Sequence, residues 1–263
     1  MGFIRTLASG SSGNAAVLSA GGTTILIDAG ISCRRIAAAL HDCDLSLSDI
    51  DAILLTHEHG DHIAGLQTLS KKTDVPLYCS AGTRVGLIRA RPELHMETRE
   101  LEPGCPVEIG GVGVTPFRTP HDTDGSVGFV FSIGRTTIGF ATDIGHIDDE
   151  MSRALLGVDC LYMEANHDIG RLLGGPYPPF LKRRVMGPFG HLANGDAAAF
   201  IRETVEKGTR RVALCHLSRE NNTPELAEAA VYDEFSANHL PPSSVQDMLL
   251  VSPAEIAGIP FHF

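Results

Sequence analysis

The stretch LLTHEHGDH ends an apolar run with three histidines, a glutamate and an aspartate, all of which can bind metal ions. His57 and His59 are two residues apart, so they point to the same side of an extended segment. Gly60 lets the backbone turn, and Asp61 and His62 then open a helix from which they can point back. This geometry suits two neighbouring metal ions, and imidazole with carboxylate favours zinc, manganese or iron over calcium. A solvated polar loop is the alternative interpretation.

Other acidic and imidazole side chains also follow apolar runs that are typical of buried strands. In α/β folds, the loops after the carboxyl ends of strands carry the chemistry. Six predicted strands end at residues of this kind, which is more than chance explains. We therefore predict one site built from Asp28; His57, His59, Asp61 and His62; His121 and Asp122; Asp143; Glu164; and His216.

The elements that must position these side chains alternate between strands and helices. Two apolar runs around Gly21 and Gly22 predict a hairpin, and IDAILLT predicts a buried strand that leads into His57. HIAGLQTLSKK has the apolar spacing of one amphipathic helix, and residues 107–142 contain three or four strands with glycine-rich turns. Helices and strands then alternate without a linker. We predict a single α/β domain over residues 1–263, with two sheets and the helices outside.

Residues 170–191 form the longest irregular segment, which is rich in glycine and proline. A loop of this length inside a compact domain is usually functional or mobile. Between residues 171 and 190 there are four basic side chains and no acidic one, in a chain of net charge −11. That net charge argues against a protein that coats nucleic acid, but it is compatible with an enzyme that has a local basic track. A solvated basic loop is the alternative.

Composition favours an intracellular protein. No apolar run approaches the ~20 residues that a membrane helix needs, and the apolar run near the N-terminus is too short for a secretory signal. The six cysteines show no CxxC spacing, so we expect reduced and mostly buried thiols. We predict a cytoplasmic location and no membrane partner.

The motif H-x-H-x-D-H after an apolar strand resembles the metal motif of the metallo-β-lactamase fold. Asp28 in LIDAG, His121, Asp143 in ATDIG and His216 in CHLSREN match the family's other motifs in order, so the resemblance covers nearly the whole chain. It implies a four-layer αβ/βα sandwich with two divalent metal ions at one edge, between the sheets. It also implies a structural role for Asp28 near the metals. The implied ligands are His57, His59 and His121 for one ion, Asp61, His62 and His216 for the other, and Asp143 as the bridge.

Further motifs narrow the resemblance. Di-iron electron-transfer members commonly carry an acidic residue at the position of His59, so a hydrolase is favoured. MEANHD, GHLAN and CHLSREN resemble motifs of tRNase Z and other phosphodiesterases, although Met163 stands where that family has a histidine. Together with SGSSGNA and GPYP, these motifs are most similar to the YycJ/WalJ group, which is associated with 5′→3′ exonuclease activity on DNA. The chain is too short for the inserted domain of the β-CASP nucleases.

These residues can support a mechanism in which a water molecule, activated by two metal ions, attacks a phosphodiester. Asp61 would be both a ligand and the proton acceptor for the water between the metals. By resemblance, His191 in GHLAN would donate a proton to the leaving alkoxide, with Glu164 orienting it, and His167 is the rival donor. His191 could instead be a structural loop residue, because Asn194 looks like the N-cap of the following helix.

Substrate contacts are expected from two loops and from the basic segment. SGSSGNA offers small residues and backbone N–H groups that suit a phosphate, although it could equally be a tight strand connection. The basic segment could meet phosphates beyond the scissile one. The candidate substrate contacts are Ser11, Ser12, Asn14, Lys182, Arg183, Arg184, Arg219 and Asn221.

The sequence therefore predicts a two-metal phosphodiester hydrolase, and specifically a 5′→3′ DNA exonuclease. The predicted metal is zinc or manganese, with iron as the alternative. Hydrolysis of a small phosphodiester or another ester is the second hypothesis, and the net charge of −11 favours it. A metal-binding regulatory protein without turnover is the third. A complete set of seven ligands with a proton donor argues against that last reading. The oligomeric state is left open.

Overall fold

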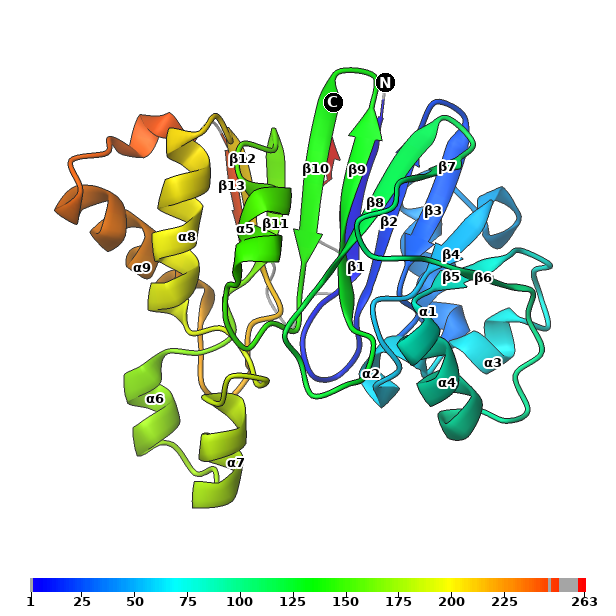
Figure 1. The fold of residues 1–263 in the computed structure, drawn as a ribbon, viewed down its shortest axis with the longest axis horizontal. Coiled ribbons are helices and arrows are strands. Elements are labelled where there is room, and N and C mark those ends of the chain that lie inside the picture. The colour runs from blue at the N-terminus through cyan, green and yellow to red at the C-terminus, as the bar shows by residue number, and fades with distance from the viewer. Residues whose placement is uncertain (1, 246, 251–259) are drawn as a thin grey trace.

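Two seven-stranded sheets pack face to face, and helices cover the outer face of each sheet (Figure 1). The computed structural model describes residues 2–245, 247–250 and 260–263. The first sheet contains, in spatial order, β14 (Phe261–His262), β1 (Phe3–Ala8), β2 (Ala15–Ala20), β3 (Thr23–Ile27), β4 (Ala52–Leu54), β5 (Leu77–Cys79) and β6 (Thr98–Glu100). The second contains β13 (Asp247–Leu250), β12 (Arg211–Cys215), β11 (Cys160–Glu164), β10 (Thr136–Ala141), β9 (Val127–Ile133), β8 (Val112–Arg118) and β7 (Val107–Ile109). This architecture confirms the predicted αβ/βα sandwich.

The inner faces of the two sheets share one apolar core. Side chains two apart on a strand point the same way, so Phe129 and Phe131 of β9 both enter this core, as do Ile25 and Ile27 of β3. The hydroxyl of the buried Tyr162 on β11 donates to the carbonyl of Ile4 on β1 at 3.1 Å. Because a buried hydroxyl needs a partner, this bond joins the two sheets as well as satisfying Tyr162.

Each outer face is covered by its own set of helices. On the first sheet lie α1 (Cys33–His41), α3 (Leu66–Leu69) and α4 (Ala81–Ala90); on the second lie α5 (Asp149–Leu155), α8 (Asn194–Glu206) and α9 (Pro224–Ala237). Two 3₁₀ turns, Leu47–Asp49 and Pro242–Ser244, complete these connections. Ser32 accepts the N–H of Arg35 and so caps α1, as the sequence predicted. Asn194 is not the cap of α8, because that position is Ala193.

The segment HIAGLQTLSKK is not one helix, so that prediction was wrong. It contains the end of α2 (Gly60–Ile63) and all of α3, with a break at Gly65. The N–H of Gly65 donates to the carbonyl of Ala29, and a Cβ at this position would lie 2.2 Å from the carbonyl oxygen of Ile31. The close approach to the loop after β3 therefore requires glycine and interrupts the helix, although the apolar spacing is that of a longer one.

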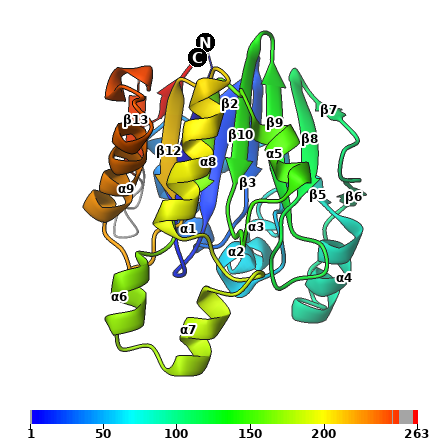
Figure 2. The ribbon, with the colours of Figure 1, turned by 60° about the vertical axis from the view of Figure 1, so that its left-hand side comes forward.

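Residues 170–191 are more regular than predicted. They contain most of α6 (Ile169–Gly174) and all of α7 (Pro179–Val185). Asp168 caps α6, and Pro178 precedes α7, which has proline at its first position, where a missing N–H costs nothing. We call residues 169–190 the arm. Figures 1 and 2 both place it beyond one end of the two sheets, away from the other helices.

The six cysteines are free, and four of them are buried. Burial raises the pKa of the Cys79 thiol to about 12 and that of Cys160 to about 11. These side chains are therefore inert apolar packing groups, in agreement with the prediction of reduced thiols. Within the described ranges, the helices are too short or too polar to span a bilayer.

Candidate metal centre and active site

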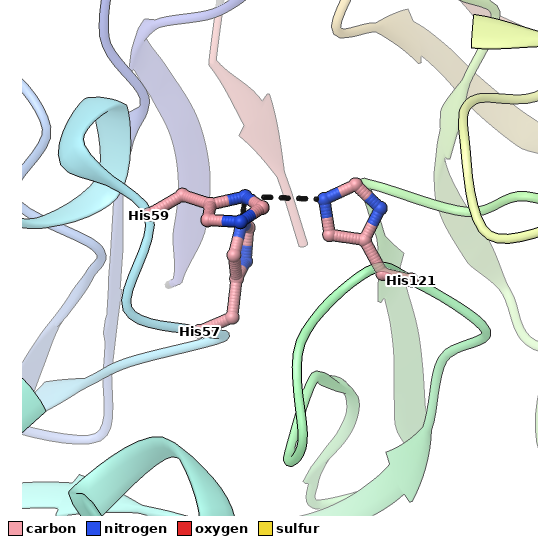
Figure 3. Close-up of side chains that lie close together, drawn as sticks. All are labelled: His57, His59 and His121. Carbon is pink, nitrogen blue, oxygen red and sulfur yellow. Dashed lines mark hydrogen bonds between the residues drawn. The ribbon is translucent and has the colours of Figure 1, made fainter. Parts of the chain in front are cut away.

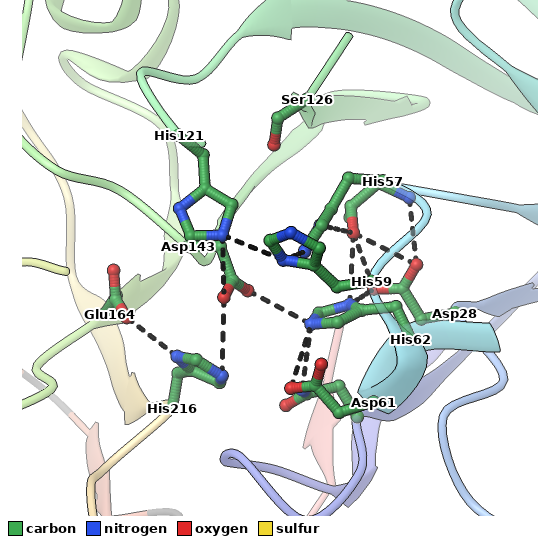
Figure 4. A network of polar contacts seen from close by, with 12 residues as sticks. Asp28, His57, His59, Asp61, His62, His121, Ser126, Asp143, Glu164 and His216 are labelled. Atoms are coloured by element: carbon green, nitrogen blue, oxygen red, sulfur yellow. Dashed lines mark hydrogen bonds and ion pairs between the residues drawn. The ribbon is translucent and has the colours of Figure 1, made fainter. Parts of the chain in front are cut away.

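The predicted strand ends meet at one edge of the sandwich (Figure 4). In the first sheet, β3 and β4 are parallel; in the second, β10, β11 and β12 are parallel, and β8 shares their direction because both β8 and β10 are antiparallel to β9. Their carboxyl ends therefore carry their loops to a common rim. The residues that come together there are Asp28, His57, His59, Asp61, His62, His121, Asp143, Glu164 and His216.

Three of these residues have a strained backbone. Asp28, Asp143 and His216 have φ angles of 58°, 58° and 55°, in the left-handed region that non-glycine residues seldom adopt. Each lies one or two residues after the end of a buried strand. Such strain persists only where the surroundings enforce it, and it is commonly found at functional sites.

His57, His59 and His121 aim ring nitrogens at a common point (Figure 3). His59 Nδ1 lies 3.1 Å from His57 Nε2 and 3.3 Å from His121 Nε2. Nitrogens about 2.0–2.1 Å from a tetrahedral ion are separated by about 3.3 Å, so this spacing fits a zinc-like ion. Burial lowers the pKa of His57 and His121, which keeps these rings neutral, as metal ligands must be.

Asp61, His62 and His216 form a second group that could hold a metal ion. Asp143 lies between the groups: its carboxylate oxygens are 3.3 Å from His62 Nε2, 3.6 Å from His216 Nε2 and 3.7 Å from His121 Nε2. Among the described residues, neither His216 Nε2 nor Asp143 Oδ2 has a hydrogen-bond partner, although both atoms are buried. Buried polar atoms are seldom left unsatisfied, so the arrangement fits a cation between them.

The far nitrogen of each buried ring is held by a specific acceptor. His62 Nδ1 donates to Asp28 Oδ2 at 2.8 Å, and Asp28 is itself fixed by the N–H and hydroxyl of Thr56. His121 Nδ1 donates to the carbonyl of Gly190 at 3.1 Å. These bonds orient Nε2 of both rings toward the centre, the arrangement that proteins use to hold metal-binding histidines. Asp28 thus has the supporting position that was expected.

Glu164 is fully buried and organises two histidines. Its Oε1 accepts from His191 Nδ1 at 2.9 Å and from His216 Nδ1 at 2.7 Å, while Oε2 accepts the N–H of Ile144. Burial alone would raise the pKa of Glu164, but the two histidines outweigh burial and lower the pKa to about 2. Burial likewise opposes charge on His216, but Asp143 and Glu164 raise its pKa to about 9.

We expect the metal-free protein to lose stability between about pH 6.5 and 9. The pKa of His216 rises on folding from 6.5 to about 9, so its contribution is full below pH 6.5 and is lost as the pH rises through 9. Metal binding needs neutral rings, so stabilisation by added zinc should grow over the same range. Melting curves in EDTA and in zinc from pH 6 to 9 test this. A zinc-induced rise in Tm that is constant with pH would contradict it.

A cavity of about 210 Å³ opens onto the metal groups. Its walls include three of the predicted substrate contacts, Ser11, Arg184 and Asn221, and the predicted proton donor His191. The remaining wall residues lie on loops and on the arm and were not predicted from the sequence: Asn166, Tyr177, Leu181, Val185 and Ser218. These hydroxyl, amide and aliphatic side chains follow no regular spacing that predicts a functional site.

Asn14, a predicted substrate contact, supports the metal groups and is not part of the wall of the described cavity. It is buried, its Nδ2 donates to Asp61 Oδ2 at 3.3 Å, and the same atom lies 2.9 Å from His62 Nε2. The backbone of Asn14 also bonds to the carbonyl of Asp61 and to Gly30. A Cβ on Gly30 would lie 1.6 Å from the Asp61 carbonyl oxygen, so the loops are in close contact. SGSSGNA is therefore a tight connection at this end, while Ser12 is exposed and lies outside the cavity wall.

The basic side chains of the arm differ in their surroundings. Lys182 Nζ donates to the carbonyl of Leu173 and so ties α7 to α6. Arg184 pairs with Asp122 at 2.7 Å, and Asp122 Oδ1 lies 3.6 Å from His59 Nε2. Arg183 is exposed, as is Arg219 in the loop after His216. Only Arg184 of these four is part of the cavity wall among the described residues.

The two rival proton donors occupy different environments. His191 lies on the cavity wall with its Nδ1 bonded to Glu164. His167 is 1% exposed, and burial lowers its pKa, so it is a neutral interior residue. Its backbone pairs with Ala193 and so helps to position the loop that carries His191. The geometry favours His191 over His167.

Comparisons with known proteins identify the family and the fold. Residues 23–217 match the family described as a beta-lactamase superfamily domain. The chain is 32% identical over 226 residues to the "Exodeoxyribonuclease YycJ" of Bacillus anthracis, covering 86% of both chains. It is 33% identical over 233 residues to the "Exodeoxyribonuclease WalJ" of Streptococcus pneumoniae, covering 88% of this chain and 87% of that one. The crystal structure of the metallo-beta-lactamase fold protein YhfI from Bacillus subtilis aligns over the full length of both chains, with a TM-score of 0.73 and 15% identity.

Proposed function

The chain belongs to the beta-lactamase superfamily, and from this premise we propose that it is a 5′→3′ exonuclease that hydrolyses DNA with two divalent metal ions. It is a metal-dependent hydrolase of the metallo-β-lactamase fold. The observation that favours a phosphodiester substrate is the hydrogen-bonded pair of Glu164 and His191 at the cavity. This pair can supply the proton that an alkoxide leaving group needs. The names of the YycJ and WalJ relatives, which are both exodeoxyribonucleases, support digestion of DNA from an end.

Two metal ions, zinc or manganese, fit the two groups of side chains. We assign His57, His59 and His121 to one ion and Asp61, His62 and His216 to the other, with Asp143 between them. When bound, such ions lower the pKa of a water molecule and offset the negative charge of the phosphodiester. The orphaned atoms His216 Nε2 and Asp143 Oδ2 support this assignment.

Asp61 is suited to receive the proton of the attacking water. Its side chain is 28% exposed, and it is part of the cavity wall. Asn14 donates to Oδ2 of this carboxylate, which restricts its rotation. The water therefore meets a positioned acceptor, and geometry of this kind lowers the entropic cost of the step.

On the leaving-group side, His191 donates its proton from Nε2, because Nδ1 is bonded to Glu164. The bond to the Glu164 carboxylate fixes the orientation of the ring and leaves Nε2 free to act on the substrate. Ser11, Arg184 and Asn221 share the cavity with these groups, and we assign them to the phosphate and sugar near the scissile bond.

Digestion of end-labelled oligonucleotides tests the proposal. Metal-loaded protein should release nucleotides from the 5′ end of DNA, and it should act on DNA faster than on RNA of the same sequence. Single-stranded and duplex substrates with a label at either end, with zinc and then manganese, distinguish polarity and metal. Hydrolysis of a small phosphodiester without degradation of any oligonucleotide would support the small-substrate alternative instead.

A further inference from the structure

The arm exposes most of the large apolar side chains found on the described surface. Eight large hydrophobic side chains are exposed in the described ranges, and five of them belong to the arm: Ile169, Leu173, Phe180, Met186 and Phe189. Phe180 is the most exposed of all, at 67%. Single exposed apolar residues are ordinary, but a concentration of this kind marks an interaction surface.

This surface is continuous with the proposed active site. Tyr177, Leu181 and Arg184 of the arm line the cavity, and Phe180 is one helical turn from Arg184, so it shares a face with that cavity residue. On the other side, Phe189 lines a second cavity of about 310 Å³, which has His121 in common with the first. Phe180 therefore shares a helix face with a residue of the first cavity, and Phe189 lines the second.

Charge identifies the kind of partner. The arm carries +4 with no acidic residue, whereas the chain as a whole carries −11, so the remainder is −15 (−11 minus +4). A symmetric dimer centred on the arm would bring together two surfaces of the same positive charge, which is unfavourable. A polyanion is attracted to the arm and repelled by the rest of the surface.

We propose that the arm binds the single-stranded end of a polynucleotide, whose bases stack on Phe180 and Phe189 while its phosphates lie near Arg183 and Arg184. The cavity of about 210 Å³ is too small for more than the terminal nucleotide, so the following nucleotides must lie on the outer surface. Bases in a duplex are already stacked and offer no free face, so the surface selects single strands. This inference rests on the proposed function and adds the form of its substrate.

Binding of a labelled phosphorothioate oligonucleotide, which resists hydrolysis, tests the proposal with metal-loaded protein. Phe180→Ala should weaken single-strand affinity roughly 5- to 100-fold, the range found for a lost base-stacking contact, and affect duplex much less. Arg183→Ala should reduce the salt slope of binding by about 0.7. Tyr232→Ala on α9 and Arg135→Ala are matched exposed controls that should leave affinity unchanged.

Unchanged single-strand affinity in Phe180→Ala and Phe189→Ala would overturn the proposal. So would a wild-type dimer that Phe180→Asp dissociates without loss of affinity, because the arm would then be a self-association surface. Hydrolysis by the wild-type protein is recorded separately. Oligonucleotide binding that depends on Phe180 without any hydrolysis would support the surface and count against the nuclease.

Discussion

Replacing Asp143 with alanine should abolish hydrolysis, with a loss of ~10³-fold or more, and should lower the metal content of the purified protein. Among the described residues, Asp143 is the one carboxylate whose oxygens lie within 4 Å of side chains from both groups, His121 on one side and His62 and His216 on the other. If both groups hold a metal ion, removing Asp143 would take a ligand from each of them. Metal ions contribute several kcal/mol to the stabilisation of the transition state, which corresponds to about 10³ in rate.

Metal analysis and end-labelled digestion of the same samples test this expectation. Asp149→Ala is a matched control, because it removes an exposed carboxylate from the first turn of α5. Circular dichroism establishes that both variants are folded. If Asp143→Ala kept two ions per chain and degraded DNA at the wild-type rate, the assignment of the metal centre would be wrong.

Much of this metal centre could be predicted because its signals are local. Alternation places His57 and His59 on one side of an extended segment, and strand ends place Asp28, Asp143 and His216 at one rim. The supports were less visible. Asn14 is 47 residues from Asp61, and only the folded chain brings the two side chains together. A separation of this length follows neither the periodicity of a helix nor that of a strand, so no sequence pattern pairs the two residues.

The arm could not be predicted for a different reason. Its helices have six and seven residues, too few for the apolar periodicity of a helix to appear, and glycine and proline separate them. The basic charge was visible in the sequence, but the exposure of Phe180 was not. A phenylalanine in an apolar context is usually buried, so only the structure identifies this ring as a surface group.

Replacing His191 with alanine should lower DNA hydrolysis by ~10²–10⁴-fold, the range typical of a lost general acid. The same variant should lose far less activity toward bis(p-nitrophenyl) phosphate, because p-nitrophenolate leaves without being protonated. His95→Ala, which removes an exposed histidine far from the strand ends in sequence, is the matched control. Rates with both substrates, measured on metal-loaded protein, give the ratio that isolates proton donation.

This ratio matters because His191 has a second interpretation. His191 lies with Asp143, Glu164 and His216 in a group that could itself hold a metal ion, and its Nδ1 is 3.8 Å from Asp143. A ligand would be needed equally for both substrates, so its loss would lower both rates alike and reduce the metal content. Glu164→Gln separates the two roles further: it weakens the hold on His191 and His216 together, since one buried oxygen accepts from both rings. If His191 is the donor, adding Glu164→Gln to His191→Ala should affect only His216. The double variant should then retain less metal than His191→Ala, while the ratio of its rates with the two substrates stays the same.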